Sequence, residues 1–160
     1  MYEHYINNIF KNPKFLFHGS PKKLDTIIPN QAYDSTGNTD NEDFAVFLTS
    51  SFIVASAYAF KNTIKRMSDG LNWEFNIGGC SDNGDVNIIF NNVRICDDIY
   101  GYVYVFQFDD NYKHCSNSVQ YKSYQEIHPI DILEIKFSNF KQFYTINSED
   151  IKCEKTSKSY

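Results

Sequence analysis

The segment from Tyr102 to Phe108 constrains the fold of this 160-residue chain more than any other. It reads Tyr-Val-Tyr-Val-Phe-Gln-Phe, a run of aromatic and β-branched residues, which fit best on a pleated, half-buried surface. The chain contains 14 Phe and 12 Tyr in all, so the same preference extends well beyond this segment. The chain is therefore predicted to fold around β-sheet, with Tyr102–Phe108 as a core strand.

Further short apolar segments, bounded by turn-forming residues, predict the remaining strands. They lie at 15–18, 45–48, 73–77, 86–90, 119–123 and 130–137. Gly78-Gly79 is expected to end the third of these segments, and Asn91-Asn92 is expected to form a turn after the fourth. No internal repeat or linker interrupts the pattern, so residues 1–160 are predicted to form one α+β domain dominated by sheet.

Two helices and one long loop complete the predicted outline. Apolar residues recur at helical spacing over 2–10 and over 52–66, where Ser50 or Ser51 can supply the N-cap. The segment 33–43 is rich in Asp, Asn, Thr and Gly, which favour turns, and it is predicted to be a mobile surface loop.

The charge balance limits the partners of this chain. Its 15 basic and 20 acidic residues give a formal net charge of −5, which argues against broad, sequence-independent binding of nucleic acid. A nucleic acid held locally, as the acceptor at an active site, remains compatible with this charge. No run of 18 apolar residues is present and the first five residues lack the features of a signal peptide, so no membrane association is expected.

The cysteines and paired acids predict no metal site. The four cysteines are scattered without a Cys-x-x-Cys pair, so free thiols in a reducing, cytoplasmic setting are expected (Cys80, Cys96, Cys115 and Cys153). Asp97-Asp98 and Asp109-Asp110 are interpreted as solvated turns flanking a strand rather than as ligands for a divalent ion.

The tripeptide His18-Gly19-Ser20 is the first candidate for chemistry, because it directly follows the apolar segment Phe15–Phe17. A polar end of a buried strand is where a ligand commonly meets a sheet. An imidazole can bond a ribose hydroxyl, and a glycine lets a flat ring approach the backbone closely. The alternative is an ordinary strand-to-loop turn with a surface histidine.

The second candidate segment pairs a strand end with a helix. Thr49 and Ser50 end the apolar run 45–48, and Tyr58 follows Thr49 by nine residues on the predicted helix. Offset stacking of an aromatic ring is worth about 0.5–1.5 kcal/mol beyond burial, so Tyr58 can clamp a flat ligand. The alternative is that Tyr58 is a core aromatic of an amphipathic helix.

The third segment is Val119 to Tyr124, followed by the apolar strand that begins at Ile130. Together with His18-Gly19-Ser20 and the segment that ends in Tyr58, it resembles the ADP-ribosyltransferase fold. The resemblance is to the branch with a His-Tyr-Glu triad, which includes the poly(ADP-ribose) polymerases and the diphtheria-type toxins. It covers most of the chain from Phe15 to Phe137 in the expected order.

The resemblance implies a fold, a substrate and a reaction. The fold would be two small, mostly antiparallel sheets packed on each other, with NAD in the cleft between them and 33–43 as a lid. The reaction would cleave the nicotinamide N-glycosidic bond and pass ADP-ribose to a protein, nucleic-acid or small-molecule acceptor, or to water. His18 would bond the adenosine-side ribose, Gly19 and Ser20 would hold the nicotinamide amide, and Tyr58 would stack on its ring. The implied NAD-binding residues are His18, Gly19, Ser20, Thr49, Ser50 and Tyr58.

Gln120 departs from the family pattern, because it stands where the catalytic Glu is expected. A carboxylate stabilises the cation that forms as nicotinamide leaves, whereas a neutral amide does so poorly. Gln120 can still hold the ribose hydroxyl. Three explanations stay open: a weak or unusual transferase, a domain that only binds, and an engineered Glu-to-Gln change.

Two rival functions follow from these residues. The first is a catalytically silent module that recognises NAD, ADP-ribose or a protein partner through the same cleft, which Gln120 favours. The second is a small toxin or phage-related effector that acts on nucleic-acid bases or ends, against which the acidic composition argues mildly.

Overall fold

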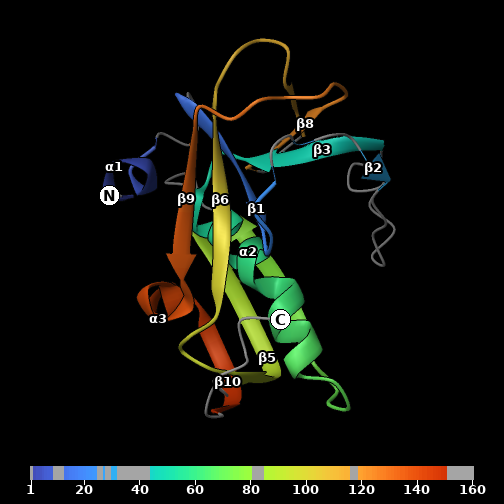
Figure 1. Cartoon of the computed structure of the whole chain (residues 1–160), viewed down its shortest axis with the longest axis vertical. Coiled ribbons are helices and arrows are strands. Elements are labelled where there is room, and N and C mark those ends of the chain that lie inside the picture. Colours follow the sequence, from blue (N-terminus) through green and yellow to red (C-terminus); the bar gives the residue numbers. More distant parts are fainter. Residues whose placement is uncertain are drawn as a thin grey trace.

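The protein's structure is a computed structural model that describes residues 2–8, 13–24, 27, 30–31, 44–80, 85–115 and 119–150. The helices are α1 (Glu3–Ile6), α2 (Phe52–Met67) and α3 (Phe137–Phe140), and the 3-10 turn η2 (Lys141–Phe143) follows α3. The strands are β1 (Phe15–Ser20), β2 (Asn30–Gln31), β3 (Phe44–Thr49), β4 (Glu74–Cys80), β5 (Val86–Ile95), β6 (Tyr100–Gln107), β7 (Lys113–His114), β8 (Gln120–Ser123), β9 (Asp131–Lys136) and β10 (Thr145–Asp150) (Figure 1). The predicted lid 33–43 lies outside the described residues.

The larger sheet has the strand order β7-β8-β3-β1-β6-β9, with β2 paired to β3, and its pairs are antiparallel. The predicted core strand is confirmed, because β6 lies between β1 and β9 and its residues 103–106 are almost fully buried. A strand with partners on both sides satisfies its backbone groups within the sheet, which suits the long apolar run.

The smaller sheet has the order β10-β5-β4, in which β4 pairs antiparallel and β10 pairs parallel with β5. The protein is therefore an α+β fold with two mostly antiparallel sheets. The sequence did not predict β10. Its residues, Thr-Ile-Asn-Ser-Glu-Asp, carry a single large apolar side chain, so the period-2 signal of a half-buried strand is absent.

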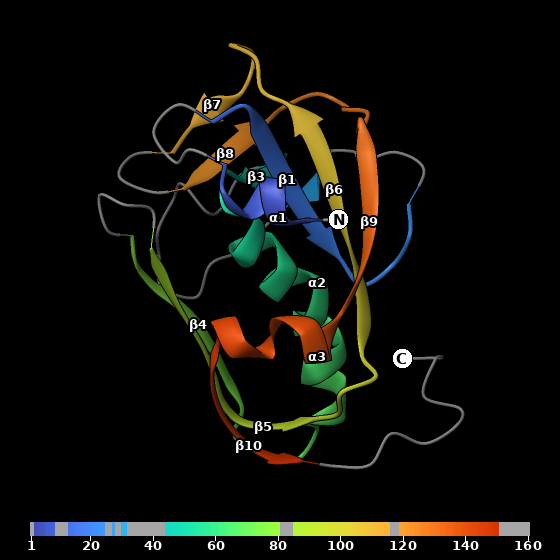
Figure 2. The ribbon, with the colours of Figure 1, turned by 90° about the vertical axis from the view of Figure 1, so that its left-hand side faces the viewer.

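The two sheets were expected to pack directly on each other, but α2 lies between them (Figure 2). On one side Phe17 of β1 packs edge-on against Phe52 of α2, with ring centroids 5.2 Å apart. On the other side α2 contacts β5, whose Ile88 and Phe90 share a buried cluster with Ile64 of the helix. A helix can fill this position because its buried residues cover a wide arc around its axis, which faces both sheets.

The sequence predicted α2 well. It begins at Phe52 after the N-cap Ser51, whose hydroxyl accepts a hydrogen bond of 3.2 Å from the Val54 amide. This bond satisfies one of the free amides at the start of the helix. None of the described helices has the length and apolar character needed to cross a bilayer.

Two predicted breaks are bulges inside continuous strands. β4 runs through Gly78-Gly79 to Cys80, with a register shift between Gly78 and Cys80 and a positive φ of 52° at Gly79. β5 runs through Asn91-Asn92, where Asn92 has a φ of 55° and the pairing with β10 shifts by one residue. Gly and Asn tolerate the left-handed conformation that a bulge requires, which is why the same residues also signal turns.

The expectation of four free thiols is wrong for Cys96, which is disulfide-bonded. Cys115 is buried and is not part of a disulfide. Disulfides persist mainly in oxidising environments, so the cysteines give no support to the expected cytoplasmic location.

Glycine is required where α2 crosses the larger sheet. A Cβ atom built on Gly19 would lie 1.9 Å from the Ala55 carbonyl oxygen, and one on Gly101 would lie 2.8 Å from Ala59. We expect Gly19→Ala to lower the free energy of unfolding by about 3 kcal/mol or more, because the clash is with helix backbone that cannot yield locally. Chemical denaturation measures this change.

Gly78→Ala is the matched control, because a Cβ there meets no atom within 4 Å. Its free energy of unfolding should change by no more than about 0.5 kcal/mol. Equal losses for the two variants would show that the close approach of α2 is not what requires Gly19.

Candidate functional site

His18 lies in the middle of β1, and its side chain faces away from α2. Side chains alternate along a strand, and Phe17 packs on α2 while Leu16 belongs to a second hydrophobic cluster on the other face of the sheet. His18 shares that other face with Tyr104, its register partner in β6. The imidazole is partly buried there.

The protonation state of His18 follows from a hydrogen bond of 2.8 Å between its Nδ1 atom and the Phe47 carbonyl oxygen. A carbonyl only accepts, so Nδ1 carries the hydrogen and donates. Burial lowers the pKa of His18 below its ordinary value of 6.5, against the smaller opposing effect of this bond. The ring is therefore neutral near pH 7 and presents Nε2 as an acceptor.

The bond between His18 and Phe47 spans a place where two strands part. β1 and β3 pair through Phe17 and Thr49, the last residue of β3. The earlier part of β3 runs almost across β1 (Figure 1). The imidazole reaches the carbonyl of the departing strand. A side chain thus ties together the two strands where their backbones diverge.

Gly19 and Ser20 complete the predicted tripeptide, and both have local partners. The backbone of Ala55 in α2 occupies the space that a Cβ atom of Gly19 would need. The packing of the helix is therefore sufficient to explain why this position is a glycine. Ser20 is buried, and its hydroxyl accepts a hydrogen bond of 3.2 Å from the Lys22 amide.

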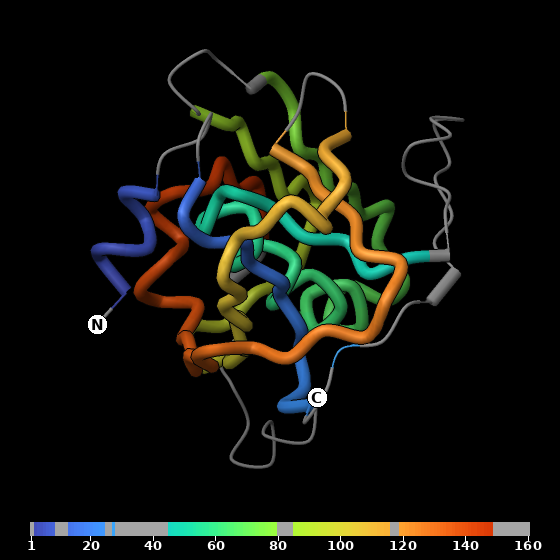
Figure 3. Tube along the Cα trace, turned by 90° about the horizontal axis from the view of Figure 1, so that it is seen from above, coloured from blue at the N-terminus to red at the C-terminus, as the bar shows by residue number. Residues whose placement is uncertain are grey.

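The second and third predicted segments meet in the sheet. Thr49 at the end of β3 is the register partner of Gln120 at the start of β8, and the two strands run side by side (Figure 3). Directly opposite residues share a face, and Phe17 places that face on the side of α2. The Thr49 hydroxyl accepts a 3.0 Å bond from the Ser51 amide, and the Ser50 amide donates to the Val119 carbonyl at 2.9 Å.

Tyr58 lies on the flank of α2 and is 44% exposed, which contradicts the alternative of a core aromatic. Phe60, on the opposite flank, packs against Phe137 of α3. Tyr58 instead meets Phe75 of β4 edge-on, with ring centroids 5.6 Å apart. Part of its ring therefore stays accessible for stacking.

The structure thus joins some of the predicted residues and separates others. Thr49, Ser50 and Gln120 come together where β1, β3 and β8 adjoin. The His18 side chain lies on the opposite face of the sheet from Gln120, and Tyr58 extends from the helix toward β4. Sequence reasoning did not find the role of Phe47, because a backbone carbonyl that holds an imidazole leaves no signature in residue type.

A separate cavity lies at the other edge of the larger sheet. It has a volume of about 830 Å³, and its lining includes Tyr100 and Tyr102 of β6 and Glu134 and Lys136 of β9. None of the predicted site residues lines it.

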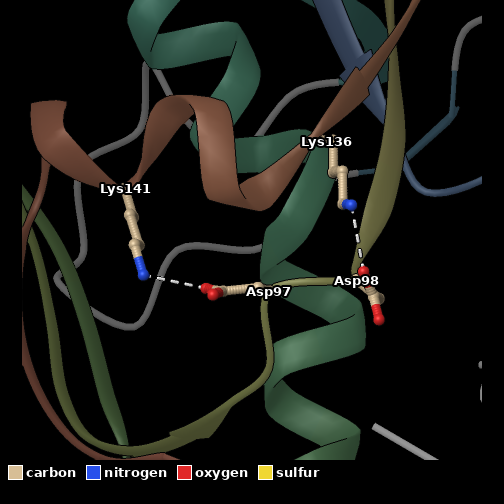
Figure 4. Close-up of polar contacts among 4 residues, drawn as sticks. All are labelled: Asp97, Asp98, Lys136 and Lys141. Atoms are coloured by element: carbon tan, nitrogen blue, oxygen red, sulfur yellow. Dashed lines mark hydrogen bonds and ion pairs between the residues drawn. The ribbon is translucent and has the colours of Figure 1, made fainter.

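Asp97 and Asp98 form ion pairs at the turn between β5 and β6. Asp97 lies 2.9 Å from the Lys141 ammonium and Asp98 lies 3.0 Å from that of Lys136 (Figure 4). The hydrogen bond from Lys136 to Asp98 is the main reason that the pKa of Lys136 is raised. Across the described ranges, no three His, Cys, Asp or Glu residues gather in a group that could hold a metal ion.

No family model, curated protein or solved structure matches this chain.

The lowered pKa of His18 predicts a pH dependence of stability. In the unfolded chain His18 takes up a proton near pH 6.5, whereas in the folded protein it does so only at a lower pH. The free energy of unfolding therefore falls as the pH drops below about 6.5. We expect His18→Gln to lose less stability than the wild type between about pH 7 and pH 5. Urea titrations across this range measure the difference, and parallel curves for the two proteins would contradict it.

Proposed function

We propose that this protein is an NAD-dependent ADP-ribosyltransferase. The bond between nicotinamide and C1′ of its ribose breaks, neutral nicotinamide leaves, and an acceptor or water attacks C1′ and loses a proton. The observation that carries the proposal is the neutral His18 imidazole, fixed by the Phe47 carbonyl at the place where β1 and β3 part. It supports the role that the resemblance gives to this histidine.

The tautomer of His18 suits a ribose hydroxyl. With Nδ1–H committed to Phe47, Nε2 can accept a hydrogen bond from a hydroxyl group. A neutral ring does so, whereas a protonated ring could only donate. Binding of a ribose at this nitrogen would therefore weaken at pH values at which His18 is protonated.

Tyr58 supports the stacking part of the proposal. Its ring is 44% exposed, meets Phe75 in an edge-type contact, and has the Lys61 ammonium over it at 5.7 Å from the centroid. The exposed part of the ring is where a flat, electron-poor ring would stack, and such stacking contributes about 0.5–1.5 kcal/mol beyond burial. Nicotinamide is such a ring.

Gln120 favours a second candidate, a module that binds NAD or ADP-ribose without turning it over. The resemblance gives its amide a hydrogen bond to the ribose 2′-hydroxyl, and in the structure Gln120 pairs with Thr49 on the face of the sheet opposite to His18. It lacks the negative charge that stabilises the developing cation, and losing a contribution of this kind costs on the order of 10² to 10³ in rate. The two candidates differ only in turnover.

The substitution Gln120→Glu separates the two candidates. For a transferase we expect nicotinamide release to rise by at least about tenfold with little change in NAD affinity, because the charge acts on the transition state rather than on bound substrate. Release of nicotinamide from NAD and the dissociation constant of NAD are both measured. Gln142→Glu, at an exposed position of η2, makes the same chemical change away from the site and should alter neither.

The substitution Tyr58→Ala tests binding. Loss of the stacking ring should weaken NAD binding by roughly threefold to tenfold. If Gln120→Glu leaves turnover unchanged while Tyr58→Ala weakens binding, the protein is a binding module. If neither change has an effect, the assignment to this family is wrong.

A further inference from the structure

The flank of α2 that carries Tyr58 also carries two lysines that lie over aromatic rings next to β4. The Lys61 Nζ atom lies 5.0 Å from the ring centroid of Phe75 and 5.7 Å from that of Tyr58. The Lys65 Nζ atom lies 5.7 Å from the ring centroid of Trp73. We call these five residues the lysine patch.

Helix and strand periodicity together place the patch on one surface. Tyr58, Lys61 and Lys65 are three and four residues apart, so they follow one another along one side of the helix. Trp73 and Phe75 are two residues apart, so they share a face, and both pack against the main hydrophobic cluster. Glu74, between them, is exposed on the other face. The one acidic residue of this segment is therefore directed away from the lysines.

The two ammonium groups are not neutralised within the described part of the chain. Neither lysine has a carboxylate partner there. Burial lowers the pKa of Lys61, and the charge of Lys65 lowers it further. Two neighbouring positive charges, one of them partly desolvated, destabilise each other unless an anion binds between them. An anion would relieve this repulsion.

We infer that the lysine patch binds single-stranded nucleic acid. Phosphates neutralise Lys61 and Lys65, and an unpaired base stacks on the aromatic rings beside them, which is the combination that single-strand sites use. A duplex fits less well, because its bases are paired and are not free to stack on the rings. We also infer that the bound strand is the acceptor of ADP-ribose, because Tyr58 belongs to both sites, and this part of the inference rests on the proposed function. The binding of the strand to the lysine patch does not depend on that function.

Trp73 makes the inference directly testable, because it is the single tryptophan of the chain. Oligodeoxythymidine of about ten nucleotides is titrated into the full chain in the absence of NAD while Trp73 fluorescence is recorded. We expect saturable quenching. The double variant Lys61→Gln/Lys65→Gln should lose at least about tenfold in affinity at low salt. The slope of log K against log salt concentration should become shallower by about 1.4, or about 0.7 for each phosphate contact.

A second double variant, Lys14→Gln/Lys23→Gln, changes the net charge equally at two exposed positions outside the patch. It should retain the affinity and the salt slope of the wild type. The inference is overturned if the fluorescence does not change saturably, or if both double variants weaken binding equally. It is also overturned if NAD quenches Trp73 and the oligonucleotide does not, because the lysines then hold the diphosphate of NAD.

Nicotinamide release, measured on the same proteins, keeps the two proposals apart. Binding of the oligonucleotide without any release of nicotinamide would support the patch and overturn the acceptor role. Release that proceeds without oligonucleotide binding would support the proposed function and overturn the patch.

Discussion

The close approach of α2 to the larger sheet is the constraint on which the rest of the structure depends. Gly19 of β1 and Gly101 of β6 bring the sheet backbone against Ala55 and Ala59 of the helix, where no larger side chain fits. With the helix this close, its opposite side remains available to the smaller sheet. One helix can therefore serve as the shared core of two sheets, and its flank beside β4 remains only partly covered.

The candidate site is a consequence of this arrangement. The short turn from Thr49 to Ser51 carries the chain from β3 directly into α2, so β3 ends beside β1 at Thr49 while its earlier residues lie apart from it. That divergence creates the position that the His18 imidazole occupies. The same helix presents Tyr58, Lys61 and Lys65 on the flank between the sheets, so the proposed NAD contacts and the lysine patch share one supporting element.

The sequence predicted those parts of the fold in which local preference and burial agree. In β6 and in α2 the intrinsic preference of the residues for strand or helix agrees with the burial that the element has in the folded protein. The predictions failed at Gly78-Gly79 and Asn91-Asn92, because residues that permit a turn also permit a bulge, and only the partner strand decides between them.

The sequence likewise brought His18, Thr49 and Gln120 into one hypothesis, but it could not reveal that the imidazole and Gln120 lie on opposite faces of one sheet. The partner of His18 is a backbone carbonyl, which residue types do not report.

The parallel pairing of β10 with β5 has a consequence for the order in which the protein can fold. β5 and β4 adjoin in sequence and can form a hairpin early, whereas β10 joins only after the whole larger sheet has been synthesised. Until then one edge of β5 has open backbone groups, and Phe90 lacks the ring of Tyr144 that packs against it in the finished fold. The smaller sheet is thus the last part of the molecule to close, although two of its three strands are made before most of the larger one.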